Sequence, residues 1–184
     1  MVIGIIIGVV VLIALYFMST YNGLVKLRNM VKDQWAQIDV LLKRRADLIP
    51  NLVETVKGYA KHESETLEAV INARNKAVGA QTTEEEIKAN GELTGALSRL
   101  FALAESYPDL KANTNFIALQ DELAGTENRI GIARKDYNEA VQEYNKSIKR
   151  FPTVFIARMF GFEEKQPFKA DDAKKEVPNV NFDE

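Results

Sequence analysis

The stretch MVIGIIIGVVVLIALYFM, residues 1–18, decides the architecture, because no charged side chain precedes Lys26. Wound as a helix, residues 2–21 extend about 30 Å at 1.5 Å per residue, which matches the hydrocarbon core of a bilayer. The stretch therefore predicts a transmembrane anchor over residues 1–21, which contacts membrane lipid through residues 2–21.

A cleaved signal peptide is the competing interpretation of this stretch. Signal peptides usually begin with basic residues and end their apolar run at small residues spaced for a peptidase. Here no Lys or Arg precedes the run, which ends with Tyr16, Phe17 and Met18. These features favour an anchor that stays attached.

Basic residues follow the anchor and none precedes it. The first of them are Lys26, Arg28, Lys32, Lys43, Arg44 and Arg45. The positive-inside rule then predicts a single-pass protein of a bacterial-type cell membrane, with its amino end outside and its body in the cytoplasm. Within the anchor, Gly4 and Gly8 form a small-xxx-small pattern that lets two transmembrane helices approach closely, although such a pattern also arises by chance in an apolar segment.

The body that follows, of about 160 residues, suits one compact domain. The chain has 24 basic and 26 acidic residues. This balance disfavours nucleic-acid binding, which needs a net basic face. Abundant unbranched side chains favour helix over sheet. Cysteine is absent, which excludes disulfides, thiolate metal sites and thiol catalysis.

Apolar residues recur at steps of three or four from Leu24 onward, which predicts a long amphipathic helix over about 22–60. Pro50 lies within it. Because the apolar register continues unshifted past this proline, we expect a kink and not a break. The phase changes at the polar residues 61–65, which predicts a turn followed by a shorter helix over about 65–78.

Capping signals delimit two further helices. Thr83 and Glu86 have the spacing of a capping box at the start of a helix over about 84–106. Ser106 is placed to cap the next helix, and Pro108 suits its first turn.

A second long helix is expected over about 109–150, with an apolar seam that includes Tyr137 and Tyr144. Its packing is of a bundle or coiled-coil kind. The predicted fold is therefore all-α, a transmembrane helix followed by an antiparallel helical bundle over residues 22–151.

Residues 152–162 form a short apolar amphipathic segment after Pro152 ends the helix. Such a segment covers the end of the bundle, enters the bilayer interface or meets a partner, and the sequence leaves these three open. The candidate contact residues are Phe155, Ile156, Met159, Phe160 and Phe162. Residues 163–184 carry seven acidic and four basic side chains and are expected to form an acidic, loosely ordered tail.

Motifs along nearly the whole chain resemble those of one family. They include Tyr21-Asn22-Gly23-Leu24-Val25, Trp35-Ala36-Gln37-Ile38-Asp39, Lys43-Arg44-Arg45-Ala46-Asp47-Leu48-Ile49-Pro50-Asn51, Ser106-Tyr107-Pro108-Asp109, Tyr137-Asn138 with Tyr144-Asn145, and Phe160-Gly161-Phe162. On these residues the chain resembles the LemA family. The resemblance implies a membrane-tethered antiparallel helical bundle, and it implies no catalytic mechanism.

Catalytic and metal sites find little support in the residues. His62 is the single histidine, so the paired Glu-x-x-His motifs of a di-metal bundle do not occur. Glu65 and Glu68 have ligand spacing, but this spacing equally suits a solvated helix face. Glycine-rich phosphate loops and a nucleophile elbow are also missing. We therefore expect no enzyme activity, no metal and no cofactor.

A polar cluster surrounds Pro50 and consists of Lys43, Arg44, Arg45, Asp47 and Asn51. Arg45 falls on the apolar seam, where a buried guanidinium requires a carboxylate partner. Glu105 and Glu127 are the candidates. Such a cluster fixes the register of the bundle, or it contacts a partner or an anionic ligand.

Two hypotheses for function follow. The first is a membrane-anchored helical scaffold or adaptor, which forms a homo-oligomer or holds another membrane protein. The alternative is a module that binds an anionic lipid headgroup or another small anion through Lys43, Arg44 and Arg45.

Overall fold

The computed structural model describes residues 1–168, and within them the chain forms six helices and no strand. The all-α bundle predicted from the sequence is confirmed. The described residues belong to two compact units. Among the described residues, unit 1 combines residues 1–32 with residues 136–168, and unit 2 comprises residues 33–135. Each unit is described separately below.

Helix α1, Val2–Tyr59, is a single helix of 58 residues, so the predicted anchor and the first bundle helix are continuous. It runs through Pro50 without a break, as expected. A proline leaves the carbonyl four residues earlier without its helical donor. Here that carbonyl belongs to Ala46, and the Arg74 guanidinium Nε donates to it at 3.4 Å. A side chain from α2 therefore supplies a hydrogen-bond donor in place of the backbone amide that proline lacks.

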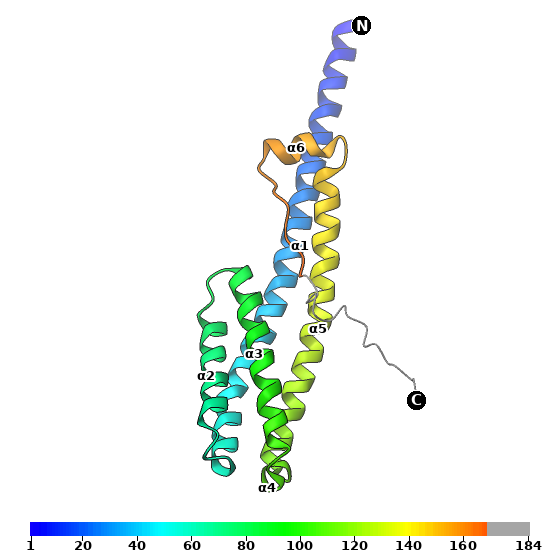
Figure 1. The fold of residues 1–184 in the computed structure, drawn as a ribbon. Coiled ribbons are helices and arrows are strands. Elements are labelled where there is room, and N and C mark those ends of the chain that lie inside the picture. The colour runs from blue at the N-terminus through cyan, green and yellow to red at the C-terminus, as the bar shows by residue number, and fades with distance from the viewer. Residues whose placement is uncertain (169–184) are drawn as a thin grey trace, which may run out of the picture. The chain divides into compact units, whose positions relative to one another are not determined.

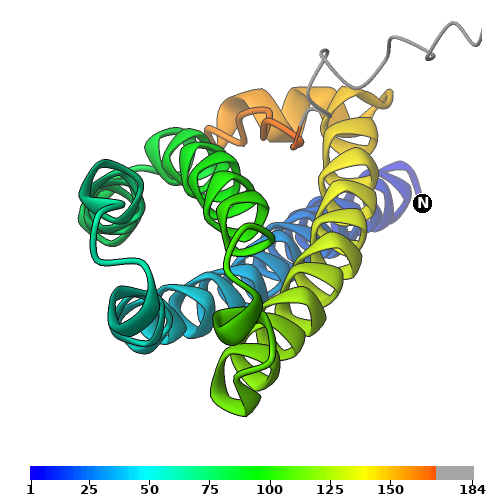
Figure 2. The ribbon, with the colours of Figure 1, turned by 60° about the horizontal axis from the view of Figure 1, so that its bottom comes forward.

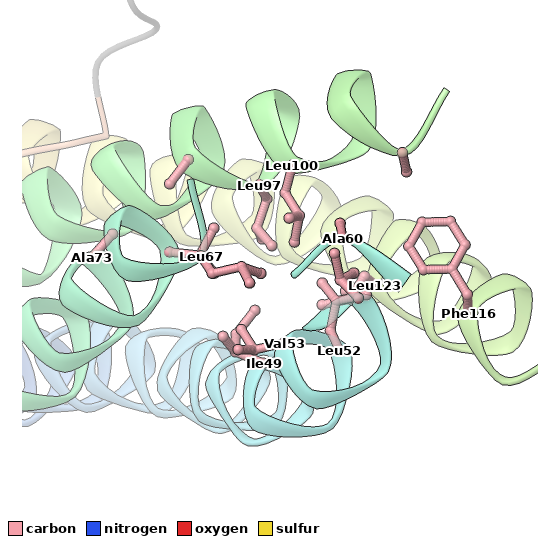
Figure 3. Close-up of a cluster of buried hydrophobic side chains, with 14 of the residues drawn as sticks. Ile49, Leu52, Val53, Ala60, Leu67, Ala73, Leu97, Leu100, Phe116 and Leu123 are labelled. Carbon is pink, nitrogen blue, oxygen red and sulfur yellow. The ribbon is translucent and has the colours of Figure 1, made fainter. Parts of the chain in front are cut away.

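In unit 2 the latter part of α1 is followed by α2, Ser64–Gly79, and α3, Thr83–Ala104, and the unit also includes the first part of α5, Thr114–Lys149. Consecutive long helices alternate in direction, and α2 lies beside α3 (Figures 1 and 2). Their inward-facing side chains form one apolar core, in which Ile49, Val53, Leu67, Leu97 and Leu123 come from four different helices (Figure 3).

The capping box of α3 lies one residue earlier than predicted. Thr82 Oγ1 accepts from the Glu85 amide at 3.2 Å, and Glu85 Oε2 accepts from the Thr82 amide at 3.3 Å. Thr82 has the extended backbone that a cap requires, whereas Thr83 is already the first helical residue. The pairing of Thr83 with Glu86 is therefore wrong.

The second long helix is interrupted near its start. The short helix α4, Pro108–Lys111, precedes α5, and Asn113 Oδ1 accepts from the Phe116 amide at 3.0 Å at the beginning of α5. Pro108 occupies the first turn of α4, as predicted. Ser106 does not cap it, because the N-cap position is Tyr107.

Candidate functional site

Arg45 is the centre of a buried polar network in unit 2. Its side chain is 1% exposed. Nη1 donates to Glu127 Oε2 at 2.5 Å and to Thr94 Oγ1 at 3.0 Å. Nη2 donates to Asn90, to its Oδ1 at 2.8 Å and to its backbone oxygen at 3.0 Å. The predicted carboxylate partner is confirmed as Glu127, and this network joins α1, α3 and α5.

Burial lowers the pKa of the Arg45 guanidinium, and the charge and hydrogen bond of Glu127 act in the opposite direction. Removing an arginine from water is costly unless its donors are satisfied. Four hydrogen bonds to the chain's own atoms satisfy the two terminal nitrogens, Nη1 and Nη2, whereas the buried Nε has no hydrogen-bond partner. The other predicted partner, Glu105, pairs with Lys111 instead, and its side chain is 63% exposed.

The remaining residues of the cluster around Pro50 do not converge on one surface. Arg44 is 57% exposed and pairs with Glu122 at 2.5 Å. Lys43 and Asp47 line a hollow beside α2 and α3. Asn51 is exposed, and its backbone oxygen accepts from the Thr55 hydroxyl at 2.8 Å.

The hollow has a volume of about 310 Å³ and a mixed charge. Its charged lining residues are Asp39, Asp47, Glu86, Lys43 and Arg74. Three carboxyl groups therefore face two cationic groups, and such a lining does not favour an anion.

Glu86 and Asp39 lie near each other in the lining of this hollow. Burial and the neighbouring Asp39 raise the pKa of Glu86 to about 7. One proton held between two carboxyl groups relieves the repulsion that two charges would produce. This pair could not be predicted from the sequence, because each residue alone fits an exposed helix face.

Unit 1 has a different character, since its first helical residues are uncovered. The side chains of residues 1–19 are all exposed, and they include large apolar groups such as Ile3, Leu12 and Phe17. Within residues 1–168, α1 is the one helix long and apolar enough to cross a membrane.

The predicted apolar segment contains α6, Thr153–Met159, and it has two faces. Ile156 and Phe162 are buried, at 1% and 7% exposed. Phe155, Met159 and Phe160 are 62%, 61% and 51% exposed. Gly161 has φ +67°, and the amides of Gly161 and Phe162 bond back to the carbonyls of Arg158 and Ala157 in a Schellman motif. This turn separates buried Phe162 from exposed Phe160.

An extended segment, residues 162–168, is held on α5 by two Tyr-Asn pairs seven residues apart. Asn145 bonds to the backbone of Lys165 through both its donor and its acceptor, at 2.7 and 2.9 Å. Asn138 does the same with Phe168, at 3.1 and 2.7 Å. Each asparagine amide therefore imitates the backbone of a neighbouring strand.

The two tyrosines complete this clamp. Tyr144 donates to the Glu163 carbonyl at 2.9 Å, and Tyr137 donates to the Gln166 carbonyl at 3.1 Å. Burial raises the pKa of both hydroxyl groups, which keeps them protonated as donors. The prediction of a loose tail fails for residues 163–168, because six side-chain hydrogen bonds hold them. Residues 169–184 lie outside the described residues.

The geometry defines a class of protein, a helical bundle with a buried arginine network and a continuous first helix whose apolar beginning is uncovered. The sequence model of the LemA family matches residues 34–182. The chain therefore belongs to the LemA family.

Relatives of known name cover most of the chain. Magnetosome protein MamQ 2 of Paramagnetospirillum magneticum strain AMB-1 is 27% identical, across 89% of this chain and 70% of its own length. Protein LemA of Metamycoplasma hominis is 25% identical, across 86% and 73%. Magnetosome protein MamQ of Magnetospirillum gryphiswaldense is 24% identical, across 80% and 64%.

Proposed function

We propose that the protein is a membrane-anchored helical scaffold with no catalytic role, and that residues 2–21 cross the bilayer. The observation that carries this proposal is that every apolar side chain at the start of α1 is exposed. About twenty such residues in water would oppose solubility, whereas a hydrocarbon core of about 30 Å accommodates them.

The proposed orientation places the helical body in the cytoplasm. Lys26 and Arg28 follow the apolar run, and no basic side chain precedes it. Basic residues next to a transmembrane helix remain preferentially on the cytoplasmic side. Tyr16, Phe17 and Tyr21 lie near the end of the proposed span and before the first basic residue, and aromatic rings are enriched at membrane interfaces.

The proposed activity is to contact a second copy of the chain or another membrane protein. Gly4 and Gly8 lie on one face of α1, and a Cβ atom added at either position would meet nothing within 4 Å. Small residues at this spacing allow close approach of a second transmembrane helix. Specific association within the bilayer would then come from this face.

Cysteine crosslinking tests this activity, because the chain contains no cysteine of its own. We expect Gly4→Cys and Gly8→Cys to form crosslinks in native membranes, to a second copy or to one recurring neighbour. Ile6→Cys is the matched control, since it lies on the opposite face of the helix and is equally uncovered. A strict monomer in detergent, with no recurring neighbour at either glycine position, would remove the scaffold proposal.

The anion-binding alternative gains no support from the described residues. Arg45 is committed to Asn90, Thr94 and Glu127, and Arg44 is paired with Glu122. Lys43 remains at a hollow in which carboxyl groups outnumber cations.

A further inference from the structure

Large apolar side chains remain exposed where α5 ends and α6 follows. Phe151 is 75% exposed, and Phe155 and Met159 are 62% and 61% exposed. Phe155 and Met159, four residues apart, lie on one side of α6, and Phe151 in the preceding turn joins them, because the rings of Phe151 and Phe155 contact edge to face at 5.8 Å. Scattered apolar residues are normal on a surface, but a contiguous group of this size indicates a contact.

This group lies beside the end of the apolar run of α1. The rings of Phe160 and Tyr21 are 4.8 Å apart, and those of Phe162 and Tyr21 are 5.8 Å apart. The Arg28 guanidinium lies over the ring of Phe162 at 5.1 Å. In Figure 1, α6 crosses beside α1 just after the uncovered first turns. A bilayer around residues 2–21 would therefore bring its headgroup region to α6.

The length and composition of α6 suit a position in the headgroup region of the bilayer. Seven residues span about 10 Å as a helix, which is too short to cross a bilayer but long enough to lie along its surface. Arg150 and Arg158 flank the exposed apolar face, and both are exposed. Arginine beside an apolar face at the membrane surface binds phosphate groups of anionic lipids while the apolar side chains enter the acyl boundary.

We propose that α6 is a second membrane contact, which lies in the cytoplasmic headgroup region of an anionic leaflet with Phe151, Phe155 and Met159 facing the lipid. This inference rests on the proposed anchor and adds an interfacial contact to it. Lipid is favoured over a protein partner because the exposed apolar surface of α6 lies next to the exposed apolar surface of α1 and has basic flanks. Ile156 and Phe162 are buried, and Phe162 packs against Tyr21 and Arg28 of α1, so this inner side holds the segment on α1 while the outer side would meet lipid.

Fluorescence quenching by brominated lipids tests the depth of α6 in the full chain. Trp35 is the single tryptophan, so Trp35→Phe provides a silent background. Phe155→Trp is then introduced, and the protein is reconstituted into vesicles of phosphatidylcholine and phosphatidylglycerol brominated near the headgroup. We expect a blue-shifted emission and a loss of about half of the intensity, as for a ring at the acyl boundary.

Two matched positions make the result decisive. Ile132→Trp in unit 2 is 63% exposed like Phe155, and we expect no quenching there. Val10→Trp lies within the proposed span and should be quenched by bromine placed deep in the acyl chains. Circular dichroism checks that each variant keeps its helical content.

The outcomes separate the two proposals. Quenching at position 10 without quenching at position 155 overturns the α6 contact and leaves the anchor intact. A loss of quenching at both positions overturns the anchor as well. A tryptophan at position 155 that is shielded only at high protein concentration, without bromine quenching, assigns the face to a second copy and also overturns the lipid contact.

Discussion

Unit 2 buries its apolar side chains and places a charge at its centre, whereas unit 1 leaves apolar side chains uncovered and holds its extended segment through neutral Tyr and Asn side chains together with an exposed ion pair between Lys149 and Glu164. In unit 2, Arg45 is 1% exposed among polar partners from other helices. In unit 1, Leu12 is 67% exposed, and Asn138 and Asn145 clamp the backbone of residues 163–168. Unit 2 therefore covers its buried charge with its own side chains, whereas the apolar side chains at the start of α1 stay uncovered in unit 1 and are the ones that the proposed anchor would place in lipid.

Among the substitutions that test this difference between the units, Arg45→Met is expected to change stability most. It leaves the buried Asn90 and the Glu127 carboxylate without their partner. We expect the free energy of unfolding of unit 2 to fall by about 3 kcal/mol. Urea unfolding of the full chain in detergent, followed by the fluorescence of Trp35, measures this change. The adjacent Arg44→Met removes only an exposed ion pair and should cost less than about 1 kcal/mol. An equal decrease in the free energy of unfolding for the two variants would show that the buried arginine contributes no more to stability than the exposed one.

The clamp of unit 1 is expected to open locally. Asn145→Ala removes both hydrogen bonds to Lys165, at about 1 kcal/mol each. Hydrogen exchange at the Lys165 amide should accelerate about 30-fold, while the Trp35 unfolding midpoint stays unchanged. Lys146→Ala, on the neighbouring position of α5, is the control and should leave the exchange rate as it is. Unchanged exchange in Asn145→Ala would contradict the clamp.

The carboxyl pair makes the stability of unit 2 depend on pH. The folded-state pKa of Glu86 is raised to about 7, above its value in the unfolded chain. The contribution of Glu86 to the free energy of unfolding is therefore greatest below the unfolded-state pKa of about 4.5, and it is lost as pH rises through about 7. Because Glu86 is partly exposed, solvent screening limits the effect to about 1 kcal/mol.

Glu86→Gln cannot ionise and should remove this part of the pH dependence. The urea unfolding midpoints of the two proteins at pH 5 and pH 8 measure this dependence. We expect the midpoint of the variant to rise relative to that of the parent protein between pH 5 and pH 8. Parallel curves for the two proteins would show that Glu86 has an ordinary pKa.

The smallest expected effect concerns the start of α3. Thr82→Ala removes the capping hydroxyl and should destabilise unit 2 by about 1 kcal/mol. Thr83→Ala, at the first helical residue, should be close to neutral. A larger loss at Thr83 than at Thr82, measured by urea unfolding, would restore the capping box expected from the sequence.

Periodicity predicted the helices well, because a helix that buries one face must repeat apolar residues every three or four positions. It also identified Arg45 as a buried charge with a carboxylate partner, since a seam position is buried whatever occupies it. It could not choose between Glu105 and Glu127, because that choice depends on the packing of α5 against α1.

Contacts between distant polar residues were beyond the sequence. Asn90 and Thr94 read as ordinary polar residues of α3, although they satisfy Arg45. The Tyr-Asn pairs left a visible signal, a repeat at seven residues on α5. Their partners are backbone atoms of residues 163–168, however, and because every residue has the same backbone groups, the sequence does not indicate which of them are bound.

The most direct test of the central claim is to extract cell membranes with alkaline carbonate and to determine the intact mass of the protein that remains. If residues 2–21 cross the bilayer, the protein stays in the membrane pellet, and its mass includes the first residues. Release of the protein into the supernatant, or a mature chain that lacks about its first twenty residues, would contradict the claim.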